Sequence, residues 1–170
     1  MTDRKMHIPY ASVEEMHREI QNEIRVKFEE VYCSNWIIQG EELKKFEEEF
    51  ASYCDSSFCV GCGNGLDALM LILKAYGIGT GDEVILPSNT FIATALAVIY
   101  TGAVPVFTEP DLLDYTIDVH KIEEKITAKT KAVIAVHLYG QPADMDAVLA
   151  ITKKYGLKLI EDAAQAHGAF

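Results

Sequence analysis

Two patterns of hydrophobic positions divide the chain. Over 13–31, and again over 43–53, apolar side chains recur at steps of three and four residues, which predicts two amphipathic helices. The first stripe consists of Val13, Met16, Ile20, Ile24, Phe28 and Val31, and the second of Leu43, Phe46, Phe50 and Tyr53. Gly40 lies between the two stripes, so we expect the helical structure to break there.

After residue 54 the pattern changes to short apolar runs separated by helical stretches. The predicted strands are 57–61, 83–87, 104–107, 132–136 and 157–161, and the predicted helices are 65–76, 91–100, 118–125 and 144–155. Runs such as "KAVIAV" and "LKLI" are almost continuously apolar, which is typical of parallel strands covered by helices on both faces. We therefore predict a three-layer α/β/α fold, with a helical arm over 1–54 and a sheet domain over 55–170.

Composition and charge exclude several classes of function. The chain has 170 residues, of which 49% are hydrophobic, and 15 basic against 26 acidic residues give a net charge of −11. An acidic chain without clustered cations suits nucleic acid poorly, so we expect no nucleic-acid partner. No apolar run approaches the roughly 20 residues of a membrane span, and the start has no signal-peptide core. We expect a cytoplasmic protein.

The four cysteines give little sign of chemistry. In a reducing compartment we expect Cys33, Cys54, Cys59 and Cys62 to be free thiols. Only "CVGC" has a spacing that zinc and redox sites use, and it has no second close ligand pair and does not open a predicted helix. We predict no metal site.

Glycines follow the first predicted strand in "VGCGNGLDAL". Asn64 is placed to cap the next helix, with Asp67 three residues later, and such a cap leaves the amides of Gly65 and Leu66 free to bind an anion. The spacing matches neither the dinucleotide-binding G-x-G-x-x-G motif nor the Walker loop. Taken alone, the motif fits either a phosphate site or a tight turn with a helix cap.

Aromatic and polar residues follow three other predicted strands. In "LPSNTF", Phe91 begins a helix, where it can stack on a flat ligand or belong to the core. In "LIEDAAQAHG", Asp162 ends a buried strand and Gln165 follows three residues later. That carboxylate can pair with a cation, hold a metal or bind a sugar hydroxyl. "VHLYGQ" adds His137, which can be structural or functional.

These groups together match one cofactor. The carboxyl ends of parallel strands meet at one edge of a sheet, so a phosphate cradle, an aromatic platform and a carboxylate are expected to lie close together. Pyridoxal 5'-phosphate is an electron sink while its ring nitrogen is protonated, and a neighbouring carboxylate favours that form. We predict that the chain binds this cofactor, with pyridoxamine 5'-phosphate as its intermediate form, and that Asp162 faces the ring nitrogen.

The chain resembles the DegT/DnrJ/EryC1/StrS family of nucleotide-sugar aminotransferases. The motifs that carry the resemblance are "NWIIQGEELKKFEEEFASYC", "GCGNGLDAL", "GDEVILPSNTFIATALAVIYTGAVPVF", "HLYGQPADMD" and "LIEDAAQAHGA". The resemblance implies the first part of a large pyridoxal-phosphate domain and a homodimer with active sites at the subunit interface. It also implies transfer of an amino group from glutamate to a keto-deoxysugar linked to a nucleotide, with carbon 3 favoured over carbon 4.

The resemblance also implies the roles of individual residues. The cofactor-binding residues would be Asn64, Gly65, Leu66, Phe91, Asp162 and Gln165. His137 would be a candidate catalytic residue, and Trp36 would lie near the substrate.

The lysine that forms the Schiff base in this family would follow "EDAAQAHGA", after Phe170. We therefore expect the full-length protein to be the aminotransferase and residues 1–170 alone to be inactive. Two alternatives stay open: a sugar dehydratase of the same fold, with histidine in place of that lysine, and a noncatalytic regulatory protein that keeps the fold.

Overall fold

The computed structural model describes residue 9 and residues 12–169. The chain divides into two compact units, Met1–Gly61 and Cys62–Phe170. Across the described residues, no helix has both the length and the apolar character that crossing a bilayer requires.

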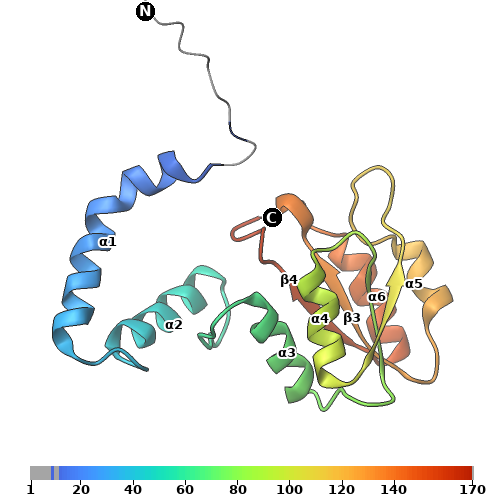
Figure 1. Ribbon diagram of the computed structural model, residues 1–170. Helices are drawn as coiled ribbons and strands as arrows, with labels where there is room; N and C mark the ends of the chain where they lie inside the picture. Colours follow the sequence, from blue (N-terminus) through green and yellow to red (C-terminus); the bar gives the residue numbers. More distant parts are fainter. Residues whose placement is uncertain (1–8, 10–11, 170) are drawn as a thin grey trace, which may run out of the picture. The chain divides into compact units, whose positions relative to one another are not determined.

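The first unit contains two helices, α1 (Glu14–Ser34) and α2 (Glu41–Tyr53), as the apolar periodicity predicts (Figure 1). Asn35 ends α1 in the left-handed conformation, with φ of 56°. Each helix begins with two glutamates, whose negative charge favours a helix N-terminus. Lys27 of α1 pairs with Glu42 of α2 at 3.7 Å, so an ion pair connects the two helices.

The prediction of a strand over 57–61 is wrong. These residues form irregular chain, and Phe58 and Val60 are 88% and 80% exposed. A strand needs a neighbour for its backbone hydrogen bonds, and no described segment pairs with this one. Instead, the amide of Gly61 donates to the carboxylate of Glu47 in α2 at 2.7 Å.

The second unit alternates helices and strands. Its elements are α3 (Gly65–Ala75), β1 (Glu83–Pro87), α4 (Ile92–Thr101), β2 (Val104–Thr108), α5 (Val119–Lys125), β3 (Thr130–Val136), the short 3-10 helix η1 (Leu138–Gly140), α6 (Met145–Tyr155) and β4 (Lys158–Asp162). Apart from η1, which was not predicted, the sequence pattern places every bound within two residues of the observed one.

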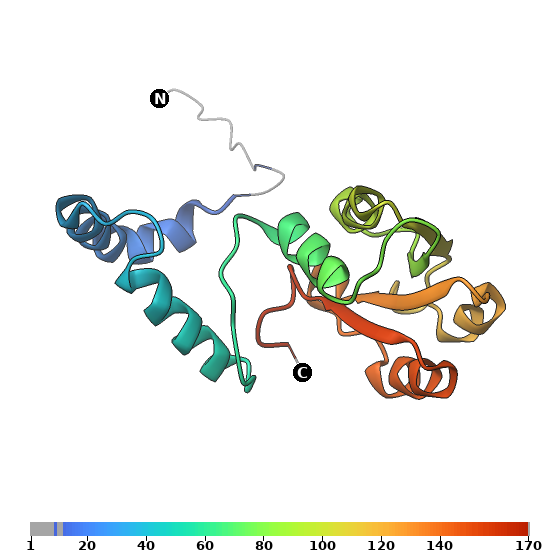
Figure 2. The same ribbon diagram turned by 90° about the horizontal axis from the view of Figure 1, so that it is seen from below.

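The four strands are parallel, in the order β2-β1-β3-β4, and helices cover both faces of the sheet (Figures 1 and 2). Successive side chains along each strand point to opposite faces. One face packs on α3 and α4 through a cluster that includes Leu73, Leu86, Val98 and Ile134. The other packs on α5 and α6 through Ile85, Ile122, Val133 and Val148. The predicted α/β/α fold is confirmed.

Candidate active site

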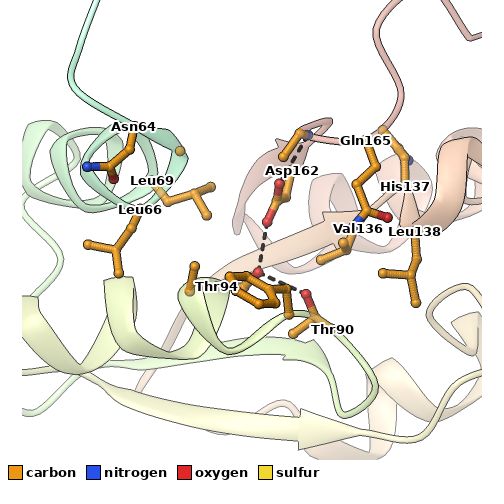
Figure 3. Close-up of a pocket in the computed structure, with 14 residues that line it drawn as sticks. Asn64, Leu66, Leu69, Thr90, Thr94, Val136, His137, Leu138, Asp162 and Gln165 are labelled. Carbon is orange, nitrogen blue, oxygen red and sulfur yellow. Dashed lines mark hydrogen bonds between the residues drawn. The ribbon is translucent and has the colours of Figure 1, made fainter. Parts of the chain in front are cut away.

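A cavity of about 410 Å³ lies at the carboxyl edge of the sheet, within the second unit (Figure 3). It forms where β3 and β4 end and where α3 and α4 begin, which is where parallel α/β sheets bind ligands. Seven of its lining residues are ones that the sequence predicts for the site: Asn64, Gly65, Leu66, Phe91, His137, Asp162 and Gln165. The others are Leu69, Thr90, Ala93, Thr94, Val136, Leu138 and Ala164.

The N-terminus of α3 forms one wall of the cavity. Asn64 caps the helix, since its side-chain oxygen accepts from the Asp67 amide and its NH₂ donates to the Asp67 carboxylate, both at 2.9 Å. Among the described residues, the amides of Gly65 and Leu66 meet no hydrogen-bond acceptor. A Cβ added at Gly65 would have no atom within 4 Å. Free donors, open space and the positive end of a helix dipole together suit a phosphate.

Asp162, at the end of β4, is held by two hydrogen bonds. Its Oδ2 accepts from the Thr94 hydroxyl at 2.8 Å, and its Oδ1 accepts from the Ala164 amide at 3.3 Å (Figure 3). The Thr94 hydroxyl also lies 2.8 Å from that of Thr90. A hydroxyl has one proton, and Thr94 uses it on the carboxylate, so Thr90 must donate to Thr94. The Thr90 hydroxyl therefore donates to Thr94, and the Thr94 hydroxyl donates to Asp162.

Gln165 lies on the loop that follows β4. Its Oε1 accepts from the amide of Tyr139 at 2.6 Å. Tyr139 is in η1 and has a positive φ of 57°. Because the side-chain oxygen is engaged, the NH₂ group of Gln165 is the part that can donate to a ligand in the cavity.

His137 follows β3 and is 6% exposed. Its Nδ1 accepts from the Ala143 amide at 3.1 Å, so the proton of the neutral ring is on Nε2, which lies 3.1 Å from the Glu161 carboxylate and donates to it. Its backbone amide donates to the Asp162 carbonyl at 3.1 Å. His137 thus connects the ends of β3 and β4 with the loop before α6, and both ring nitrogens bind groups of the chain.

The two aromatic residues of the predicted site lie in different units. Phe91, at the N-cap of α4, borders the cavity and is 69% exposed, so it is not a core residue. Trp36 belongs to the first unit, where it lines a cavity of about 170 Å³ together with Ile37, Gly40 and Leu43.

Sequence reasoning missed Thr94 and its pairing with Thr90. Both sit within "TFIATALAVIY", a stretch whose pattern predicts only an apolar helix. The available signal was their spacing of four residues, which places two hydroxyls on one face at the start of that helix. Asp162, which accepts from Thr94, is 68 residues further along the chain, and only the folded sheet brings the two together.

Comparison with solved structures shows that this is the fold of an aminotransferase. The structure of DesV from S. venezuelae, in complex with a ketimine intermediate, matches with a TM-score of 0.93 and 45% identity, over 96% of this chain and 44% of that one. NtdA from Bacillus subtilis, solved with the bound cofactor PMP, matches with a TM-score of 0.89 and 34% identity, over 99% and 39%.

The chain belongs to the DegT/DnrJ/EryC1/StrS aminotransferase family, whose family model matches residues 18–170. The dTDP-3-amino-3,6-dideoxy-alpha-D-galactopyranose transaminase of Aneurinibacillus thermoaerophilus is 54% identical over 162 residues. That match covers 95% of this chain and 45% of the relative, so the chain spans about half of the relative's length. The predicted family is confirmed.

Proposed function

We propose that the full-length protein is a pyridoxal 5'-phosphate-dependent aminotransferase acting on a nucleotide-linked sugar. One observation carries the proposal: the free amides of Gly65 and Leu66 and the fixed carboxylate of Asp162 border the same cavity. The cofactor needs donors for its phosphate and a negative charge for its ring nitrogen, and this cavity offers both. Family membership and the PMP-bound relative support the same conclusion.

The residues of the cavity fit this cofactor. Those that would hold its phosphate are Asn64, Gly65 and Leu66. Phe91 would lie against the ring, Asp162 would face the ring nitrogen, and the NH₂ group of Gln165 would donate on the side of the ring hydroxyl. When bound, the cofactor supplies an electron sink for the carbon that gains or loses the amino group.

The remaining walls of the cavity are mostly apolar. Leu69, Val136 and Leu138 line it and are each at least nine-tenths buried. Apolar walls exclude water, and charges interact more strongly where water is excluded. We infer that these residues strengthen the interaction of Asp162 with a protonated ring nitrogen.

For His137 we propose a positioning role. The expectation of a catalytic role requires a ring nitrogen that can exchange a proton with the substrate. In this structure Nδ1 binds the Ala143 amide and Nε2 binds Glu161, so the imidazole is already satisfied. We propose that His137 holds the loop after β3 against the Asp162 strand end.

The proposed acceptor is a nucleotide-linked keto-deoxysugar aminated at carbon 3, with glutamate as the donor. The name of the relative from A. thermoaerophilus supports both the nucleotide and the carbon. The nucleotide diphosphate needs cations, which this acidic chain does not cluster around its cavity. We propose that the rest of the polypeptide and a second subunit of a homodimer supply them, and that Trp36 lies near the substrate.

Cofactor loading of the full-length protein tests the proposed function. Added pyridoxal phosphate should give the absorption of bound cofactor, and borohydride reduction should increase the protein mass by one reduced cofactor. Glutamate should then be converted to 2-oxoglutarate. Residues 1–170 should form no covalent adduct and should not turn over, because the lysine implied by the resemblance would follow Phe170. A full-length protein that binds no cofactor contradicts the proposal, and binding without an adduct favours the dehydratase.

Replacing Phe91 by alanine should weaken cofactor binding by about fivefold, since stacking on an aromatic ring contributes about 1 kcal/mol beyond the buried area. Stability should change by less than about 0.5 kcal/mol, because the side chain is 69% exposed. Equilibrium dialysis against pyridoxamine phosphate and chemical unfolding measure the two quantities. Unchanged affinity would show that Phe91 does not contact the cofactor.

A further inference from the structure

Thr94 is a buried polar residue on an otherwise apolar helix face. It is 1% exposed, and its neighbours on α4 include the buried Ala95, Ala97 and Val98. A buried hydroxyl is unfavourable unless it is hydrogen-bonded, and valine fills nearly the same volume without that cost. Packing therefore does not explain a threonine here. Its hydroxyl instead bonds to Thr90 and Asp162, both at 2.8 Å.

We propose that Thr94 is a positioning residue that, with Thr90 behind it, fixes the Asp162 carboxylate toward the ring nitrogen of the bound cofactor. This inference rests on the proposed function. Within the described chain, the carboxylate binds Thr94 through Oδ2 and the Ala164 amide through Oδ1. These two bonds fix the plane of the carboxylate, and a carboxylate has about four acceptor positions, so acceptor capacity remains for a ligand in the cavity.

The order in which the Thr90 and Thr94 hydroxyls donate has a chemical consequence. Thr90 donates to Thr94 and Thr94 donates to Asp162, and hydrogen bonds in such a chain strengthen one another. A hydrogen bond donated to a carboxylate stabilises its ionised form. With the cofactor bound, a carboxylate oriented in this way would favour the protonated ring nitrogen, which is the form of the ring that accepts electrons.

The test compares Thr94→Val with Thr94→Ser in the full-length protein, using pyridoxamine phosphate labelled with ¹⁵N in the ring. This probe binds without a covalent bond, so the measurement does not depend on turnover. In the wild type and in Thr94→Ser, the ring nitrogen should give the resonance of the protonated form. In Thr94→Val, the resonance should move toward that of the unprotonated ring, and the affinity should fall about tenfold, as expected for losing a hydrogen bond to a charged group.

Thr90→Val is the second variant. Thr90 is only half-buried, so this variant keeps the test decisive if Thr94→Val does not fold. It should move the resonance in the same direction by a smaller amount, and it should add nothing to Thr94→Val, because the two hydroxyls act in series.

The possible outcomes separate this inference from the proposed function. If the wild type binds the probe and both valine variants retain its affinity and resonance, the positioning role is wrong and the proposed function stands. If Thr94→Ser behaves like Thr94→Val, the hydroxyl is not the group that matters, and the inference is again wrong. If the wild type does not bind pyridoxamine phosphate, the proposed function fails and this inference fails with it.

Discussion

Asp162→Asn in the full-length protein should lower the turnover number for transamination by about a thousandfold. Removing one charge of a desolvated pair costs about 4 kcal/mol, which corresponds to that factor in rate. The asparagine has nearly the same shape, and its side-chain oxygen can still accept from Thr94, so the contact between α4 and β4 should persist. The variant should therefore fold normally, losing the long bond from the Ala164 amide and the negative charge proposed to keep the ring nitrogen protonated.

A matched control removes a carboxylate elsewhere in the same unit. Asp146 is exposed on α6 and does not line the cavity, so Asp146→Asn should retain wild-type turnover. Turnover with glutamate and the free energy of unfolding should be measured for both variants. Near-normal turnover of Asp162→Asn would refute the role proposed for Asp162, and a large loss of stability would leave misfolding as the cause of inactivity.

Gly65→Asp should weaken the binding of pyridoxamine phosphate by at least about a hundredfold while leaving the protein as stable as the wild type. A Cβ at this position meets no atom within 4 Å, so the chain itself tolerates the side chain. A carboxylate in the first turn of α3 interacts favourably with the helix dipole. It also lies where the phosphate should bind, and two negative charges a few ångströms apart repel by about 3 kcal/mol at an effective dielectric constant of about 20.

Gly65→Asn separates the charge of the new side chain from its bulk. Asparagine has the size of aspartate without its charge, so it should weaken binding less than aspartate does. Equilibrium dialysis gives the affinities, and thermal unfolding without cofactor gives the stabilities. Equal, wild-type affinity in both variants would show that the phosphate does not bind at the N-terminus of α3.

The elements of the second unit could be predicted because their patterns are local. "KAVIAV" forms the buried strand β3, "LKLI" forms most of the edge strand β4, in which Ile160 is buried, and the helices between them repeat their apolar positions with the helical period. The segment 57–61 also has a short apolar run, but a strand needs a partner as well, which a local pattern does not reveal.

The candidate site could be predicted only in part, for a related reason. Asn64, Phe91 and Asp162 stand at the ends of predicted elements, and parallel strands bring such ends together. The partners of these groups depend on packing and register. The bond between Thr94 and Asp162 joins α4 to β4, and the bond between His137 and Glu161 depends on how β3 and β4 are aligned.

The order of the strands has a consequence for folding. The amides of Gly65 and Leu66 are nearly 100 positions from Asp162 in sequence. The two groups meet only after β3 has paired with β1 and β4 has paired with β3. Such long-range parallel pairing forms slowly, because chain closure costs entropy before the contacts are gained. A ligand that needs both groups can bind only the finished structure. Such a ligand would therefore stabilise the protein by lowering its unfolding rate. It would leave the folding rate unchanged, because it does not bind the partly folded chain.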